Sequence, residues 1–127
     1  MIDLAKFEAF DFSEGVPYVS ITNNGLTFNK SVIMKMNYPS TVKLLIDAED
    51  KQIAIQVCDE GDEKSVQFYK PKANGVLSVR WNARDLINTI ARVTEWNLKE
   101  TSYRVNGVCV PEYSLMLFDL NEAQIML

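Results

Sequence analysis

The chain has 127 residues, of which 47% are hydrophobic, and this size and composition predict one globular domain. Histidine is absent, which excludes Ser-His-Asp and Cys-His nucleophiles and any zinc site that needs imidazole. The net charge is −4, and two cysteines are too few for a disulfide framework or an all-thiolate zinc site.

The sequence also limits where the protein acts and what chemistry it performs. No apolar stretch approaches the roughly 18 residues that a membrane-spanning helix needs. The segment 1–5 lacks the basic region and apolar core of a signal peptide. The carboxylates, lysines and tyrosines show no spacing that places an acid beside a base. We therefore expect a cytoplasmic protein that does not enter a membrane, is not an enzyme and holds no metal or cofactor.

Residues 1–17 form an N-terminal arm rich in phenylalanine. Leu4, Phe7 and Phe10 lie at helical spacing. Phe10 and Phe12, however, alternate as in a strand, so the local pattern does not decide the conformation. Either the arm packs on its own chain, or Phe7, Phe10 and Phe12 dock on a partner, because three phenylalanines are costly to leave in water.

Residues 18–57 predict a first strand–helix–hairpin unit. Its expected elements are a strand over 18–22, a turn over 23–25, a strand over 26–28, a helix over 30–36 and a hairpin of strands 42–46 and 52–57. Asn29 precedes the helix, where its side chain can accept a hydrogen bond from a first-turn N–H, an interaction worth about 1 kcal/mol. Alternation in the hairpin predicts a buried face, formed by Val42, Leu44, Ile46, Ile53, Ile55 and Val57.

Residues 58–75 are typical of an acidic linker between two units. The run from Asp59 to Glu63 lacks the ligand spacing and the terminal Glu of a calcium-binding EF-hand loop. A solvated loop is therefore expected, with one additional strand over 66–69.

Residues 76–127 predict a second unit of the same kind. Its expected elements are a strand over 76–81, a helix over 83–96 capped by Asn82 and Asp85, and a hairpin of strands 103–110 and 114–120. The hairpin turn falls at 111–113, or alternatively at Asn106-Gly107, which would make three short strands. Asn121 is expected to cap a last helical turn that reaches Met126.

The two units share a short sequence pattern, Leu-Thr-Phe-Asn at 26–29 and Val-Arg-Trp-Asn at 79–82. In each case a β-type run ends in an aromatic residue, and an Asn then precedes a helix. The sequence therefore predicts an α+β fold, mainly antiparallel β with two short helices. In this fold two strand–helix–hairpin units make a pseudo-duplicated single domain that spans 1–127.

The first unit resembles the swapped-hairpin, AbrB-like domain, a family that also includes MazE-type antitoxins and MraZ-like regulators. The resemblance rests on the strand over 19–22, the Asn-Asn-Gly turn at 23–25, the short strand, the helix-initiating Asn29, the short helix and the hairpin. The second unit matches less well, because no comparable turn precedes Ser78. The resemblance implies hairpins that interlock into one barrel, here between two copies in one chain, and it implies binding to duplex DNA.

Family members normally place Arg after the turn glycine and in the helix, whereas this chain has Leu26, Lys30 and Lys35 there. The predicted DNA-binding residues lie near the starts of the two helices, and they are Lys30, Lys35, Arg80 and Arg84. A pseudo-twofold between the units would gather them into one basic patch. The alternative is that they are ordinary solvated charges.

A second hypothesis is a protein-interaction or assembly module that does not bind nucleic acid. The acidic balance and the phenylalanines of the arm favour contact with a protein partner or with a second copy. Methionines at 34, 36, 116 and 126 suit adaptable apolar contacts, although methionine at such positions is also common in a core.

Overall fold

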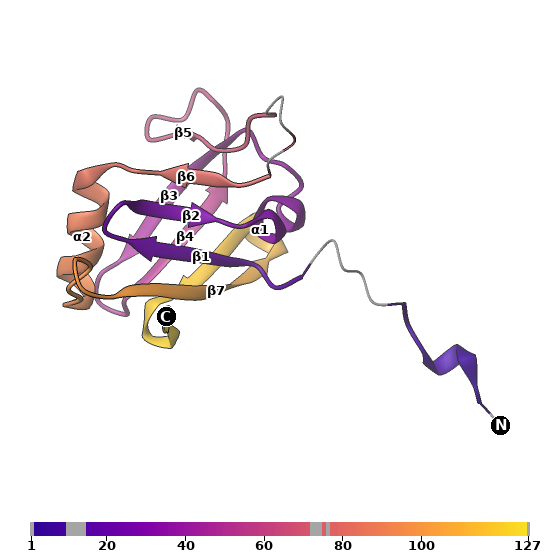
Figure 1. The fold of residues 1–127 in the computed structure, drawn as a ribbon. Helices are drawn as coiled ribbons and strands as arrows, with labels where there is room; N and C mark the ends of the chain where they lie inside the picture. The colour runs from indigo at the N-terminus through magenta and orange to yellow at the C-terminus, as the bar shows by residue number, and fades with distance from the viewer. Residues whose placement is uncertain (1, 10–14, 72–74, 76, 127) are drawn as a thin grey trace.

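The structure is a computed structural model that describes residues 2–9, 15–71, 75 and 77–126. Its strands are β1 (Tyr18–Thr22), β2 (Gly25–Phe28), β3 (Thr41–Asp47), β4 (Gln52–Val57), β5 (Val66–Gln67), β6 (Val79–Trp81), β7 (Ser102–Val110), β8 (Leu115–Asp119) and β9 (Gln124–Met126). Its helices are α1 (Lys30–Lys35) and α2 (Arg84–Thr94), with single 3₁₀ turns at Leu4–Lys6, Pro111–Tyr113 and Leu120–Glu122. The predicted α+β class, mainly antiparallel β with two helices, is confirmed (Figure 1).

The strands form one curled sheet in the order β5-β3-β4-β8-β7-β1-β2-β6, and β9 pairs with β7. The curl brings the two end strands, β5 and β6, close to each other. There the Trp81 indole Nε1 donates a hydrogen bond to the Gln67 carbonyl oxygen at 3.4 Å. The Phe68 and Trp81 ring centroids lie 5.9 Å apart at the same seam. The apolar core therefore fills the inside of the curl.

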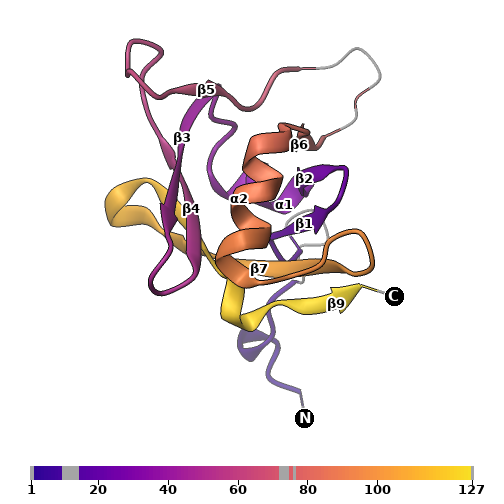
Figure 2. The same ribbon diagram turned by 90° about the vertical axis from the view of Figure 1, so that its left-hand side faces the viewer.

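The two helices lie at opposite ends of the curled sheet (Figures 1 and 2). Helix α1 buries Val32 and Ile33, and the longer α2 buries Ile87 and Ile90. Each helix thus directs an apolar stripe into the core and an exposed face to solvent.

The two units are related by an internal pseudo-twofold. In the β2–β6 ladder, the pairs are Leu26–Trp81, Thr27–Arg80 and Phe28–Val79. In the β4–β8 ladder, Ala54 pairs with Leu117, with the pairs Ile53–Phe118 and Ile55–Met116 on either side. Exchanging β1, β2, β3 and β4 with β5, β6, β7 and β8 preserves the neighbours in the sheet, with the Trp81–Gln67 hydrogen bond in place of the β1–β2 ladder.

Strand exchange between the units follows the same symmetry. Strand β1 of the first unit pairs with β7 of the second, and β5, the counterpart of β1 within the segment predicted as a linker, pairs with β3 of the first. Each helix is preceded by a short strand and followed by a hairpin, β3–β4 after α1 and β7–β8 after α2, and both hairpins belong to one continuous sheet.

The local predictions of the first unit are largely confirmed. Asn29 is the N-cap of α1, and its Oδ1 accepts hydrogen bonds from the Val32 N–H at 3.2 Å and from the Tyr18 N–H at 3.0 Å. The predicted burial of the hairpin face is wrong for two residues, because Ile46 and Val57 are exposed. Each lies directly opposite a buried residue, Ile53 or Val42, so the strand pairing continues there while only one partner of each pair is covered.

Three predictions in the second half differ from the structure. Asn82 does not cap α2, because the N-cap residue is Ala83 and no side chain bonds the first turn. Residues 124–126 are not helical, since they form β9 on the outer edge of β7. The alternative hairpin turn at Asn106-Gly107 is also wrong, because both residues lie within β7 and the turn is at Pro111–Tyr113.

The strand predicted over 66–69 is shorter, since β5 ends at Gln67. The backbone beyond it still bonds to the chain before β3, because the Phe68 N–H donates to the Ser40 carbonyl at 2.8 Å. In the arm, the described residues 2–9 are all exposed, so this part does not pack on its own chain. Phe10 and Phe12 lie outside the described residues.

The different roles of the two asparagines give a stability test. Asn29→Ala removes the α1 cap, the bond to Tyr18 and the 2.9 Å bond from Nδ2 to the Val16 carbonyl. We expect urea unfolding to show a loss of about 2 kcal/mol. Asn82→Ala is the matched control, and we expect a change within about 0.5 kcal/mol. Equal losses in both variants would contradict the assignment of the cap.

Candidate nucleic-acid interface

One face of the curled sheet is polar and free of carboxylates. We call the outer side of β9, β7, β1, β2 and β6 the polar face, and its strands lie in front in Figure 1. In β1, β2, β6 and β7 its side chains alternate with core residues of the same strands, so they point outward. Its polar members are Tyr18, Ser20, Thr22, Thr27, Arg80, Ser102, Arg104, Asn106 and Gln124, and the exposed apolar side chains of Val108 and Met126 lie on the same side.

A continuous row of these side chains crosses the five strands. The register places Gln124 opposite Arg104, Arg104 opposite Ser20, Ser20 opposite Thr27, and Thr27 opposite Arg80. Arg104 and Arg80 are three strand spacings apart, or about 14 Å between their Cα atoms. That separation is comparable with the width of the DNA major groove, about 12 Å.

The arginines on or beside this face contact neutral groups. Arg80 Nη2 donates to the Asn24 carbonyl at 3.3 Å, and Arg84 Nη1 donates to the Asn23 Oδ1 at 3.2 Å. The Arg104 guanidinium lies 4.9 Å from the centre of the Tyr18 ring. Because these contacts involve no carboxylate, the three guanidinium groups keep their full positive charge available to an anion.

Acidic residues are concentrated elsewhere in the fold. The five strands of the polar face contain no Asp or Glu. The opposite half of the sheet carries Asp47 in β3 and Asp119 in β8, and the β3–β4 turn adds Glu49 and Asp50. The acidic run 59–63 follows β4 and bonds to itself, with the Asp59 N–H donating to the Asp62 carboxylate at 3.1 Å. Within the strands, Asp and Glu therefore lie only in the half of the sheet away from the polar face, where Lys43 of β3 also lies.

The four sequence-predicted basic residues fall into two groups. Arg80 and Arg84 meet at the Asn23–Asn24 turn, at the α2 end of the polar face. Lys30 and Lys35 belong to α1, at the opposite end of the sheet (Figure 1). The structure thus brings together two of the four and leaves the α1 pair apart from them.

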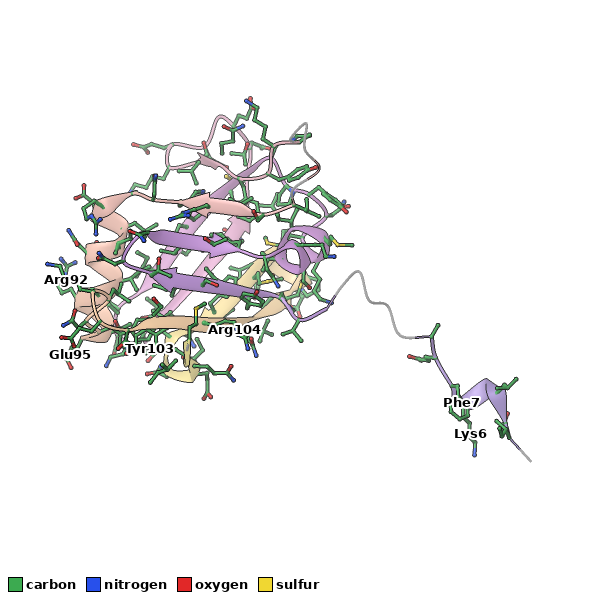
Figure 3. All side chains as sticks on the ribbon, in the orientation of Figure 1. Lys6, Phe7, Arg92, Glu95, Tyr103 and Arg104 are labelled. Carbon is green, nitrogen blue, oxygen red and sulfur yellow. The ribbon has the colours of Figure 1, made fainter. Side chains whose placement is uncertain are left out.

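Arg104 is the functional candidate that the sequence did not indicate. Its place in a strand was predicted, but its position opposite Ser20 depends on the pairing of β1 with β7. Figure 3 shows its side chain on β7, well away from Arg92 at the end of α2. Local patterns carry no signal for such a long-range pairing.

Metal-binding clusters and membrane-spanning helices are not found among the described residues. Within them, no group of three or more His, Cys, Asp or Glu side chains gathers to hold a metal ion. Across the same residues, no helix is both long enough and apolar enough to span a membrane. Comparisons with protein-family models, with curated proteins and with solved structures find no significant match to this chain. The swapped-hairpin resemblance therefore stays a prediction.

The two cysteines should differ in reactivity. Partial burial raises the pKa of the Cys58 thiol, the Asp62 carboxylate raises it further, and Lys43 opposes these effects. Cys109 is exposed. At mildly alkaline pH we expect Cys58 to react with iodoacetamide a few-fold more slowly than Cys109, as measured by peptide mass spectrometry. Asp62→Asn should lower the Cys58 pKa and speed its labelling, and an unchanged rate would contradict this cause.

Proposed function

We propose that this protein is a non-enzymatic, cytoplasmic DNA-binding protein that contacts the phosphate backbone of duplex DNA through the polar face. The observation that carries the proposal is the absence of Asp and Glu from all five strands of this face, in a chain with 17 acidic and 13 basic residues. A face without carboxylates can attract a polyanion even though the net charge of the chain is −4.

The chemistry of the face supports backbone contact. Phosphate oxygens accept hydrogen bonds from Arg and also from Ser, Thr, Asn, Gln and Tyr side chains, which make up the polar face. Arg80, Arg84 and Arg104 supply the charge, and the hydroxyl groups between them supply short donors. Lys30 directly follows Asn29, beyond the end of β2, and adds a contact for a longer duplex. The swapped-hairpin resemblance supports duplex DNA over other polyanions.

A salt titration tests the proposal. With three phosphate contacts, the logarithm of the binding constant should fall with the logarithm of salt concentration with a slope of about −2.7. Affinity for a fluorescein-labelled duplex of mixed sequence should thus fall roughly 40-fold from 50 to 200 mM salt, as measured by anisotropy. The double variant Arg80→Gln and Arg104→Gln should reduce the size of the slope by about 2.

The control changes the same charge outside the face. Lys64 and Lys99 are exposed, in the acidic linker and after α2, so Lys64→Gln with Lys99→Gln should leave the slope unchanged. Equal losses in the two double variants would show non-specific attraction to net charge. Absence of binding at about 50 mM salt would exclude the function, since backbone contacts are strongest there.

A protein-interaction module is the second candidate, and a different observation favours it. Ile2, Leu4 and Phe7 of the arm are exposed, although apolar side chains of this size gain free energy on burial. The arm therefore offers an apolar contact that the polar face does not use.

A further inference from the structure

A groove of about 400 Å³ lies at the α1 end of the sheet. Its lining is mainly apolar, and the residues that matter here are Met36, Pro39, Val57, Cys109, Pro111 and Leu115. The side chain of Val57, which lines the groove, is 38% exposed. Tyr113, in the 3₁₀ turn that begins at Pro111, is also exposed. This groove is separate from the polar face, so the inference below does not depend on the proposed function.

Under the internal pseudo-twofold, the exposed groove wall has a buried counterpart at the other end of the sheet. The exchange that maps Ile53 onto Met116 also maps Val57 onto Leu120, which is only 4% exposed. The segment 95–101 after α2 packs at that end of the molecule. Its Trp96 stacks on Tyr103 with ring centroids 3.9 Å apart, and its Leu98 is buried in the core.

The first unit has no counterpart of this segment. Helix α1 has 6 residues against 11 in α2, and only residues 36–40 connect it to β3. The first unit therefore lacks the aromatic residue and the leucine that follow α2 in the second unit, and its end of the sheet has the open groove. An apolar segment with the same two kinds of side chain would fit it.

The N-terminal arm carries such a segment. Leu4 is 77% and Phe7 is 68% exposed, and the Asp3 carboxylate shapes their 3₁₀ turn by accepting from the Ala5 N–H at 3.2 Å. Figure 3 shows Phe7 far from the folded body. The arm leaves the body at the α1 end, where the Ser31 hydroxyl donates to the Gly15 carbonyl at 3.2 Å.

We propose that Leu4 and Phe7 of one copy dock in the α1-end groove of a second copy. Residues 2–9 are exposed and so do not fill the groove of their own chain, which leaves it open to the arm of another molecule of this chain. Exchange of two arms between two grooves closes a symmetric dimer and leaves no free arm. An interface of this size belongs to the weak class, so the dimer should form and dissociate with protein concentration.

Sedimentation velocity over two decades of protein concentration tests the proposal. The full chain should shift from monomer to dimer, and Leu4→Ser with Phe7→Ser should stay monomeric at every concentration. Val57→Lys places a charge in the groove wall and should also prevent dimers. Lys6→Ala changes the same 3₁₀ turn without removing an apolar contact, so it should behave as the full chain does.

Mixing the variants tests the reciprocity of the exchange. The arm variant retains a groove and the Val57→Lys variant retains an arm, so an equimolar mixture should form one arm–groove contact and a weak heterodimer. A full chain that is monomeric throughout would overturn the proposal. Dimers that survive both the arm and the groove substitutions would overturn it as well.

Cys109 in the groove allows a direct test of which arm docks there. Ala5→Cys in a Cys58→Ser background keeps Leu4 and Phe7 and adds a thiol beside them. With oxidised glutathione we expect a disulfide between positions 5 and 109 of different chains, seen as a dimer on non-reducing gels and assigned by peptide mass spectrometry. The additional Cys109→Ser variant should give no such dimer. A 5–109 disulfide within one chain would show that the arm folds back on its own body, and the proposal would be wrong.

Discussion

The packing of Phe28 joins both halves of the curled sheet. Its ring lies 5.0 Å from Trp81, 5.3 Å from Phe68 and 5.8 Å from Phe118, so one side chain of the first unit contacts three elements of the rest. Each edge-to-face pair contributes about 0.5–1.5 kcal/mol beyond its buried area. The same approach of β2 to β6 requires glycine at position 25, because a Cβ there would lie 2.5 Å from the Trp81 carbonyl oxygen.

This packing also determines what the outer surface carries. Successive side chains of a strand point to opposite sides, so placing Phe28 and Trp81 inward places Thr27 and Arg80 outward. A slip of β6 by one residue would bury the Arg80 guanidinium and expose the indole of Trp81, at a cost that the core does not tolerate. The core and the polar face are therefore two consequences of a single register.

The sequence predicted the features that depend on near neighbours. Asn29 next to a helical pattern was recognisable as a cap because the capping bond spans three residues. Asn82 has the same local sequence around it, but Ala83 is the N-cap residue of α2. The local sequence pattern alone was therefore not enough to predict the cap. The exposure of Val57 and the place of Arg104 in the polar face depend on strands that pair across the whole chain. Alternation predicts which side a residue faces, but not what lies opposite it.

The two copies of the repeat share a backbone plan and differ in the surface that each carries. Under the pseudo-twofold Arg80 corresponds to Thr27, so the guanidinium near the axis belongs to the second unit alone. Arg84 corresponds to Ser31, which donates to the arm instead of presenting a charge. The second unit thus supplies the arginines on and beside the polar face, the first supplies the arm, and residues of both line the open groove. A surface with this asymmetry cannot make equal contacts with both halves of a palindrome, so a single chain on DNA would favour an asymmetric site.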